Sequence, residues 1–229
     1  FRDPKVSWYE AEQKWIMVFA AQDRIMFYTS PNLIDWEKES EFLAERASNE
    51  GVWECPDFFP LEYKGEKKWV LLVSIGDGGP NGGSATKYYI GDFDGKRFIS
   101  DDPSSVSRWI DFGKDNYAGV TFSNWSNEAK GVLYLGWMSN WEYANQVPTT
   151  KWRSAMTLPR ELELTENQEG YRLRSKAPKD WDKYMTKTLK KETFSHQKET
   201  LWVISPMPFP LPLFAFDHQI TDLAFCLIN

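Results

Sequence analysis

Arg2-Asp3-Pro4 followed by Lys14-Trp15-Ile16-Met17-Val18 decides the fold, because the same order of segments returns at Glu54-Cys55-Pro56 and Lys68-Trp69-Val70-Leu71-Leu72-Val73. Each apolar run is short and bounded by turn residues, which is typical of a β-strand. A third strand and the start of a fourth follow in each unit, at residues 24–29 and 36 in the first and 88–93 and 96 in the second. The chain therefore repeats a four-strand unit.

A third, looser copy of the unit follows. Its four strands are predicted at residues 117–122, 132–137, 156–158 and 162–164, and residues 172–174 are predicted as one more strand. Closely spaced strands without intervening helices are typical of an all-β sandwich, barrel or propeller. Because four strands recur at a period of about 50 residues, which is the signature of a propeller blade, we predict an all-β propeller over residues 1–175.

The amino-acid composition argues against several classes of binding partner. The chain has 27 Lys and Arg against 33 Asp and Glu, a net charge of −6, which argues against a nucleic-acid partner or a polybasic membrane anchor. No apolar run reaches the 18 residues of a membrane helix. The two histidines, His196 and His218, have no acid or cysteine cluster near them, so we predict no metal site and no cofactor. The aromatic content of 16% suits sheet packing and also stacking on sugar rings.

Two acids occupy matching places in the repeat. Asp3 and Glu54, 51 residues apart, each stand at the start of a first strand, just before a proline or a Cys-Pro pair. In a propeller the first strand of each blade lines the central channel, so both acids are expected at one mouth of it. Paired carboxylates are what glycoside cleavage requires. The alternative is that both are surface acids that cap turns.

At these residues the chain resembles glycoside hydrolase family 32, which comprises invertases, levanases and exo-inulinases. Five motifs follow in family order over residues 1–175: Arg2-Asp3-Pro4, Trp53-Glu54-Cys55-Pro56-Asp57-Phe58, Asp111-Phe112-Gly113 with Tyr117-Ala118, Gly136-Trp137-Met138-Ser139-Asn140-Trp141 with Tyr143 and Pro148-Thr149, and Ser154-Ala155-Met156-Thr157-Leu158-Pro159-Arg160-Glu161-Leu162. The resemblance implies a five-bladed propeller followed by a β-sandwich. It also implies hydrolysis, with retention, of terminal β-fructofuranosides such as sucrose.

The resemblance also implies roles for particular residues. Glu54 would act as general acid and then as base, and Asp3 would hold two fructose hydroxyls and stabilise the transition state. Arg2 would bind the same sugar and keep Asp3 ionised, and Cys55 would tune the neighbouring acid.

The remaining implied site residues lie later in the chain. Asp111 and Lys114 would sit near Glu54 or the leaving group, and Trp137 or Trp141 would form a flat wall of the sugar subsite. Apolar cover for Glu54 is expected from Trp53, Phe58 and Phe59.

One family feature is absent from these residues. The family's nucleophile is an aspartate in a Trp-Met-Asn-Asp-Pro-Asn-Gly block ahead of the Arg-Asp-Pro motif, and the 229 residues contain no such block. We therefore expect an incomplete propeller that is inactive on its own. Two alternatives stay open: a fructosyltransferase of the same architecture, and a sugar-binding propeller without catalysis.

Three other segments carry weaker signals. Residues 176–229 are highly charged and then proline-rich, so we expect a divergent tail, disordered or mis-joined, where the family has its β-sandwich. The alternative is an extended segment that lies on the propeller. Asn124-Trp125-Ser126 is a glycosylation sequon, which has meaning only in a secreted protein; secretion is favoured, with a cytoplasmic location as the alternative. The glycine-rich residues 77–83 are expected to form a flexible loop at the pocket rim rather than a phosphate site.

Overall fold

The computed structural model describes residues 1–43, 50–103, 105–123 and 131–178, together with the backbone of three short strands nearer the C-terminus. Within this part of the chain, the elements are β-strands and two three-residue 3-10 turns, Glu10–Glu12 and Ala144–Gln146. No helix in the described residues has the length and apolarity to cross a membrane. The all-β prediction is confirmed, and the sequon at Asn124 lies outside the described residues.

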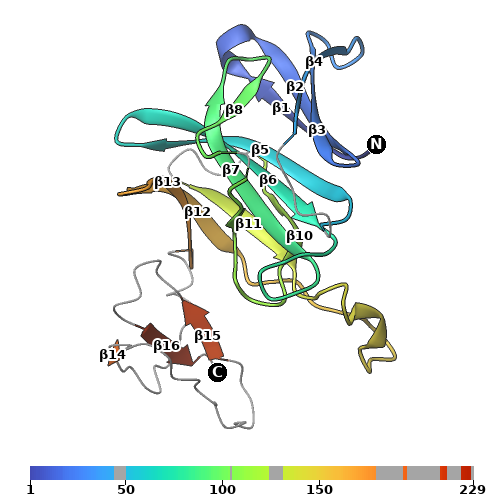
Figure 1. Ribbon diagram of the computed structural model, residues 1–229, viewed down its shortest axis with the longest axis vertical. Coiled ribbons are helices and arrows are strands. Elements are labelled where there is room, and N and C mark those ends of the chain that lie inside the picture. The colour runs from blue at the N-terminus through green and yellow to red at the C-terminus, as the bar shows by residue number, and fades with distance from the viewer. Residues whose placement is uncertain are drawn as a thin grey trace.

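Three antiparallel four-stranded arrays follow one another along the chain, and Figure 1 shows them in succession from the blue end to the orange. We call them blades 1 to 3. Blade 1 contains β1 (Arg2–Tyr9), β2 (Lys14–Ala21), β3 (Arg24–Ser30) and β4 (Glu37–Phe42). Blade 2 contains β5 (Trp53–Tyr63), β6 (Glu66–Ile75), β7 (Ala85–Phe93) and β8 (Phe98–Ser100), with β9 (Arg108–Trp109) also paired to β7. Blade 3 contains β10 (Tyr117–Thr121), β11 (Val132–Trp137), β12 (Arg160–Asn167) and β13 (Gly170–Lys176).

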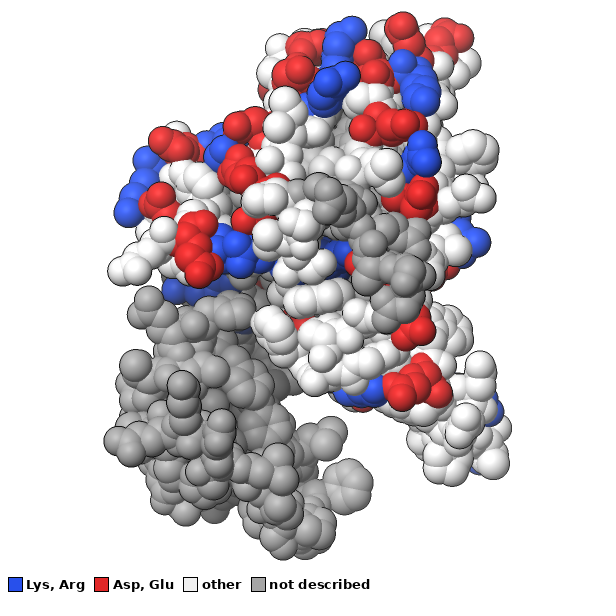
Figure 2. Space-filling view, viewed as in Figure 1, with Lys and Arg blue, Asp and Glu red and all other residues white. Residues whose placement is uncertain are grey.

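A separate three-stranded sheet lies in the tail, in the order β14 (Thr193–Phe194), β16 (Leu223–Leu227), β15 (Pro212–Ala215). Most of the tail lies outside the described residues, so its predicted divergence stays a prediction. Over the rest of the molecule, Figure 2 shows acidic and basic side chains interspersed across the upper part of the face in view.

The predicted strands of blade 3 are partly wrong. Residues 156–158 are not a strand, since Met156 makes an isolated bridge with Trp137. The third strand is β12, which contains the segment predicted as the fourth, and β13 is the fourth. Met156 and Leu158 are 56% and 44% exposed, so their apolar side chains lie outside the core, whereas Thr157 between them is buried. Thr157 is instead tied to Gly136, with the amide of each donating to an oxygen of the other.

Blade 2 is buried on both faces, which explains the unbroken apolar run Trp69-Val70-Leu71-Leu72-Val73 in β6. Alternate side chains of this run enter two cores: Trp69 and Leu71 pack between blades 1 and 2, and Val70 and Leu72 between blades 2 and 3. The residues predicted to cover Glu54 belong to these cores: Trp53 and Phe58 to the first, Phe59 to the second.

The first strand of each blade carries the same irregularity. The register of β1 against β2 shifts between Arg2 and Lys5, that of β5 against β6 between Glu54 and Asp57, and that of β10 against β11 between Tyr117 and Val120. An extra residue on one strand is a β-bulge, which bends the strand and redirects its side chains.

A residue with left-handed backbone sits in each bulge. These residues are Asp3 (φ 56°), Cys55 (φ 47°) and Ala118 (φ 52°). The bulges align Asp3 with Cys55, and Glu54 with Arg2. The predicted equivalence of Asp3 and Glu54 is therefore wrong by one residue, because a repeat of 51 residues matched acid to acid, whereas the backbone repeats after 52.

Just beyond the bulges, three side chains join the first strands of all three blades. The carboxylate of Asp57, fully buried, forms an ion pair with Lys5 at 3.1 Å and accepts a hydrogen bond from the hydroxyl of Thr121 at 2.7 Å. The Lys5 ammonium also donates to the Thr121 carbonyl at 3.0 Å. We call these three residues the Asp57 clamp. It holds β1, β5 and β10 together directly beneath their bulges.

Removing the clamp carboxylate should destabilise the protein strongly. Asp57→Ala leaves the ammonium of Lys5 and both the hydroxyl and the backbone amide of Thr121 without their buried partner, so we expect a loss of about 3 kcal/mol in the free energy of unfolding, measured by urea denaturation. The matched control is Asp92→Ala. The Asp92 side chain is 70% exposed and forms an ion pair with Lys68 at the surface. This substitution should cost less than about 1 kcal/mol. Equal losses in the two variants would contradict a structural role for the clamp.

Candidate active site

The carboxylate of Glu54 lies at the meeting point of the three first strands. The guanidinium of Arg2 in β1 forms an ion pair with its Oε1, and the hydroxyl of Tyr117 in β10 donates a hydrogen bond to its Oε2. Arg2, Glu54 and Tyr117 occupy the same position, directly before the left-handed residue, in their three bulges. Glu54 is 23% exposed at its side chain, so the group is held from two sides and still reaches solvent.

Asp3 is bound to the residue next to Glu54. Its Oδ2 accepts a hydrogen bond from the backbone amide of Cys55 at 2.9 Å and faces the Cys55 sulfur at 3.6 Å. The structure thus brings both sequence-predicted acids to one place. It differs from expectation in one contact: Arg2, expected to keep Asp3 ionised, forms its ion pair with Glu54.

Two neutral groups in this cluster are kept protonated. Burial, reinforced by the negative charge of Asp3, raises the pKa of the Cys55 thiol to about 12. Burial and the hydrogen bond to Glu54 raise the pKa of the Tyr117 phenol well above its usual range. At neutral pH both groups therefore act as hydrogen-bond donors to the carboxylates beside them.

An aromatic wall stands next to Glu54. The Tyr117 ring lies 6.1 Å from the ring of Trp137 and 6.4 Å from that of Trp141, and the two tryptophan rings are 4.9 Å apart. Trp141 is 49% exposed, so part of its face is open to solvent. An open aromatic face beside carboxylates is suited to stacking against a sugar ring.

Asp111 is held by residues of blade 3 and its entry loop. It forms an ion pair with Arg160 and lies 3.4 Å from the side-chain amide of Asn116. Asn116 precedes Tyr117, so Asp111 connects with Glu54 through two intervening residues.

Lys114 points toward the glycine-rich loop. It forms an ion pair with Glu142 and donates to the carbonyl of Asn81 at 2.7 Å. The loop that contains Asn81 was expected to be flexible, yet it is tied to the segment around Lys114.

Several residues of this network were not identified from the sequence as site residues. Tyr117, Arg160 and Asn140 stand inside the recognised motifs, but each has a partner at least 49 residues away: Glu54, Asp111 and Ser84, respectively. The sequence indicated these residues only as members of a motif, and a motif does not show which group a side chain contacts.

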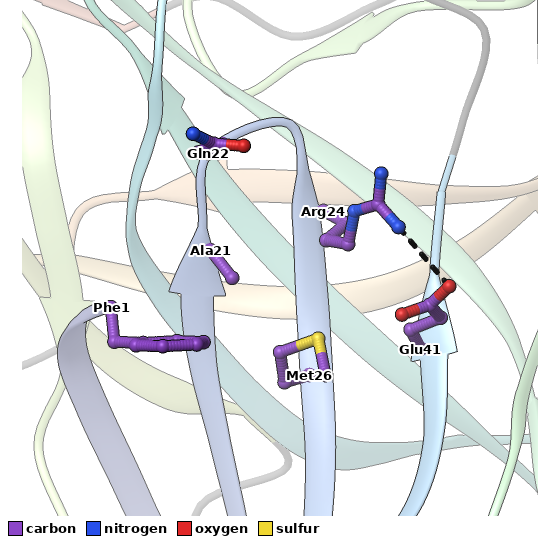
Figure 3. A pocket seen from close by; sticks show the side chains of 6 residues that line it. All are labelled: Phe1, Ala21, Gln22, Arg24, Met26 and Glu41. Atoms are coloured by element: carbon purple, nitrogen blue, oxygen red, sulfur yellow. Dashed lines mark hydrogen bonds and ion pairs between the residues drawn. The ribbon is translucent and has the colours of Figure 1, made fainter.

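A hollow of about 410 Å³ opens at the edge of blade 1 (Figure 3). It is lined by Phe1, Ala21, Gln22, Arg24, Met26 and Glu41, with Arg24 and Glu41 ion-paired across it. The acid cluster of Asp3 and Glu54 is not part of this lining. In the described residues, no group of three or more His, Cys, Asp or Glu is placed to hold a metal ion.

Residues 1–177 match the N-terminal domain of glycosyl hydrolases family 32. The chain belongs to this family. It is 52% identical over 176 residues to a levanase of Bacillus subtilis, covering 76% of this chain and 26% of that protein. It is 46% identical over 168 residues to an extracellular exo-inulinase of Meyerozyma guilliermondii, covering 72% of this chain and 32% of the relative. The chain thus spans between a quarter and a third of the length of these family members.

Solved structures of the family share the fold. The exo-inulinase of Aspergillus awamori matches with a TM-score of 0.75 at 34% identity, over 85% of this chain and 39% of that one. The β-fructofuranosidase of Schwanniomyces occidentalis, solved with fructosyl-erythritol, matches with a TM-score of 0.68 at 34% identity, over 95% and 41% of the two chains. The match to family 32 structures confirms the propeller predicted from the repeat.

The high pKa of Cys55 predicts an unreactive thiol. In a Cys226→Ser background, where Cys55 is the only cysteine, we expect iodoacetamide at pH 9 to label the folded chain about 10²–10³-fold more slowly than the urea-unfolded chain, because almost no thiolate is present. Asp3→Asn should speed labelling by removing the adjacent negative charge, and equal rates in folded and unfolded chains would contradict the assignment.

The raised pKa of the Cys55 thiol also predicts how the contribution of this group to the free energy of unfolding depends on pH. The folded pKa of Cys55 lies above the unfolded value of about 9, so its contribution to stability is complete below pH 9 and is lost as the pH rises toward 12.

Proposed function

We propose that this chain supplies the acid/base half of a glycosidase that cleaves terminal, non-reducing β-D-fructofuranosides, such as sucrose and fructans, with retention. The observation that supports the proposal is the convergence of Arg2, Glu54 and Tyr117, with Asp3 joined to the same cluster through Cys55. The names of the relatives, levanase and exo-inulinase, point to fructans as substrates.

We assign Glu54 as the general acid and then the general base. As acid it protonates the glycosidic oxygen while the bond to the leaving sugar breaks, and as base it takes a proton from the incoming water. Arg2 and Tyr117 each hold one oxygen of its carboxylate, so the group is fixed in direction before substrate arrives. A catalytic group held in a fixed position can raise the rate of the chemical step by orders of magnitude, because it does not have to be reoriented during the reaction.

We assign Asp3 as the group that stabilises positive charge on the fructose ring. The amide and the thiol of Cys55 both face Oδ2, so the carboxylate is restrained and Oδ1 keeps a constant direction. In this proposal Oδ1 accepts hydrogen bonds from two fructose hydroxyls, and these bonds strengthen as the ring becomes oxocarbenium-like. Arg2, whose side chain is 49% exposed, is assigned to bind the same sugar with the part of its guanidinium that Glu54 does not use.

The remaining predicted residues are assigned to the walls of the site. Trp137 and Trp141 present flat faces to the sugars, while Cys55 acts through Asp3. Asp111 and Lys114 are assigned to the side of Glu54 where the leaving group departs. Each is already ordered by an ion pair, with Arg160 and Glu142 respectively, so little freedom is lost when substrate binds.

A retaining mechanism also requires a nucleophile to form the fructosyl intermediate. The 229 residues contain no Trp-Met-Asn-Asp-Pro-Asn-Gly block, so we assign the nucleophile to no residue of this chain. The chain then contributes proton transfer and sugar binding, and bond cleavage requires an aspartate from outside it.

A hybrid enzyme tests the proposal. The 176-residue segment that aligns with the Bacillus subtilis levanase replaces its counterpart in that enzyme, and release of fructose from levan and sucrose is measured. We expect activity in the hybrid, and Glu54→Gln should lower kcat by at least about 10³-fold with little change in KM, because one group serves both steps.

The matched control for that experiment is Glu62→Gln, which changes an exposed glutamate farther along the same strand. It should leave kcat unchanged. A hybrid in which Glu54→Gln retains full turnover would remove Glu54 from the mechanism.

The purified 229-residue chain should not hydrolyse sucrose. Without a nucleophile no covalent intermediate forms, so fructose release should stay at the level of the buffer alone in a sensitive enzymatic assay. Turnover by the purified chain that is abolished by Glu54→Gln would show that another residue of this chain serves as nucleophile.

A further inference from the structure

Asn140, in the loop after β11, is a fully buried polar residue that joins three loops. Its side-chain Nδ2 donates to the carbonyls of Gly82, Ser84 and Lys114 at 3.2, 3.1 and 2.8 Å. Its Oδ1 accepts from the amides of Ser84 and Glu142 at 3.2 and 2.9 Å. Both the amide nitrogen and the carbonyl oxygen of the side chain are therefore used, and every contact is to backbone: four to the other two loops and one, to Glu142, within its own loop.

The three loops come from different parts of the propeller. One is the β6–β7 hairpin of blade 2, one connects β9 to β10, and one follows β11 in blade 3. Two further contacts hold them together: Ser84, 2% exposed, accepts the Trp141 amide at 3.0 Å through its hydroxyl, and Lys114 donates to Asn81. We call these loops, from residues 79–84, 111–116 and 138–142, the Asn140 rim.

The hairpin approaches Asn140 more closely than a side chain would allow. A Cβ added to Gly83 would lie 2.0 Å from the Asn140 Oδ1, and Gly83 has a left-handed backbone with φ of +66°. Glycine at this position lets the backbone close onto the asparagine. The close contact therefore depends on both residues: a glycine without a side chain at position 83 and the amide of Asn140.

The Asn140 rim includes Trp141, whose ring lies 6.4 Å from that of Tyr117, the residue bonded to Glu54. Lys114 is held through its own carbonyl by Asn140. A general acid must touch the glycosidic oxygen, which joins the fructose to the leaving sugar. Because Asp3 is assigned to the fructose ring, the Tyr117 side of Glu54 is assigned to the leaving sugar.

We propose that Asn140 is a positioning residue that fixes Trp141 and Lys114 against the leaving sugar and so sets the preference of the site for oligosaccharide substrates. This inference rests on the proposed function. Groups ordered before binding lose little entropy when substrate arrives, so the effect of Asn140 falls on substrate binding rather than on the chemical step.

Fluorine NMR of the full 229-residue chain, labelled with 5-fluorotryptophan, tests the positioning. Trp141→Phe removes one resonance and so assigns Trp141, and Trp53→Phe assigns a reference in the core. In Asn140→Ala we expect the Trp141 resonance to shift and narrow, because the indole gains mobility, while the Trp53 resonance stays in place.

The matched control is Asn32→Ala. Asn32 also accepts hydrogen bonds from two backbone amides, but in a turn of blade 1. It should leave the Trp141 resonance unchanged. If Asn140→Ala does not fold, Ser84→Ala removes only the hydroxyl that accepts the Trp141 amide, and it should move the same resonance. An unchanged Trp141 resonance in a folded Asn140→Ala or Ser84→Ala chain would overturn the positioning role.

The levanase hybrid tests the consequence for substrate. Asn140→Ala should raise KM for a fructan oligosaccharide about tenfold, with a smaller rise for sucrose and little change in kcat. Equal changes in KM for both substrates, or a fall in kcat alone, would overturn the role in substrate preference. A hybrid that is inactive with Asn140 intact would count against the proposed function, and the NMR result would still decide the positioning of Trp141.

Discussion

A β-bulge at the start of each first strand is the constraint on which the site depends. Each bulge places one residue in the left-handed region, at a cost of about 1–2 kcal/mol for a residue such as Cys55 or Ala118. This backbone is maintained because the surrounding structure fixes it: the Asp57 clamp joins the three strands beneath the bulges, and two cores pack the blades behind them. The result is that one side chain from each blade, Arg2, Glu54 or Tyr117, is directed to a common point.

The chemistry of the cluster follows from how its charges are shared. Two carboxylates lie near each other, and each is accompanied by donors that suit a different role. Glu54 has one cation and one phenol, whereas Asp3 has an amide and a thiol that stays protonated. The environments of the two acids therefore differ although they arise from equivalent bulges, because the bulge aligns Glu54 with Arg2 and Asp3 with Cys55. Differing environments for paired carboxylates are how glycosidases separate an acid/base from a charge-stabilising group.

Strand positions in blades 1 and 2 were predictable because a buried strand needs a short apolar run, and runs such as Lys14–Ala21 are bounded by turn residues. The same rule was wrong at Met156 and Leu158, where the apolar side chains face solvent. Asp3 and Glu54 could be identified as candidates from the sequence. The partner of Arg2 could not, because a β-bulge changes the direction of a side chain and no residue pattern in the sequence indicates the bulge. Asn140 was missed for a related reason, because its partners are backbone groups and most of them belong to loops far away in the chain.

We propose that Asp3 and Glu54 act on the two sides of one fructosidic bond. A crystal structure of the levanase hybrid carrying Glu54→Gln, with sucrose bound, measures this directly. The account predicts the amide of the substituted residue about 2.6–3.2 Å from the glycosidic oxygen, with Asp3 hydrogen-bonded to hydroxyls of the same fructose ring. Sucrose bound with either residue out of contact with that fructosyl unit would contradict it.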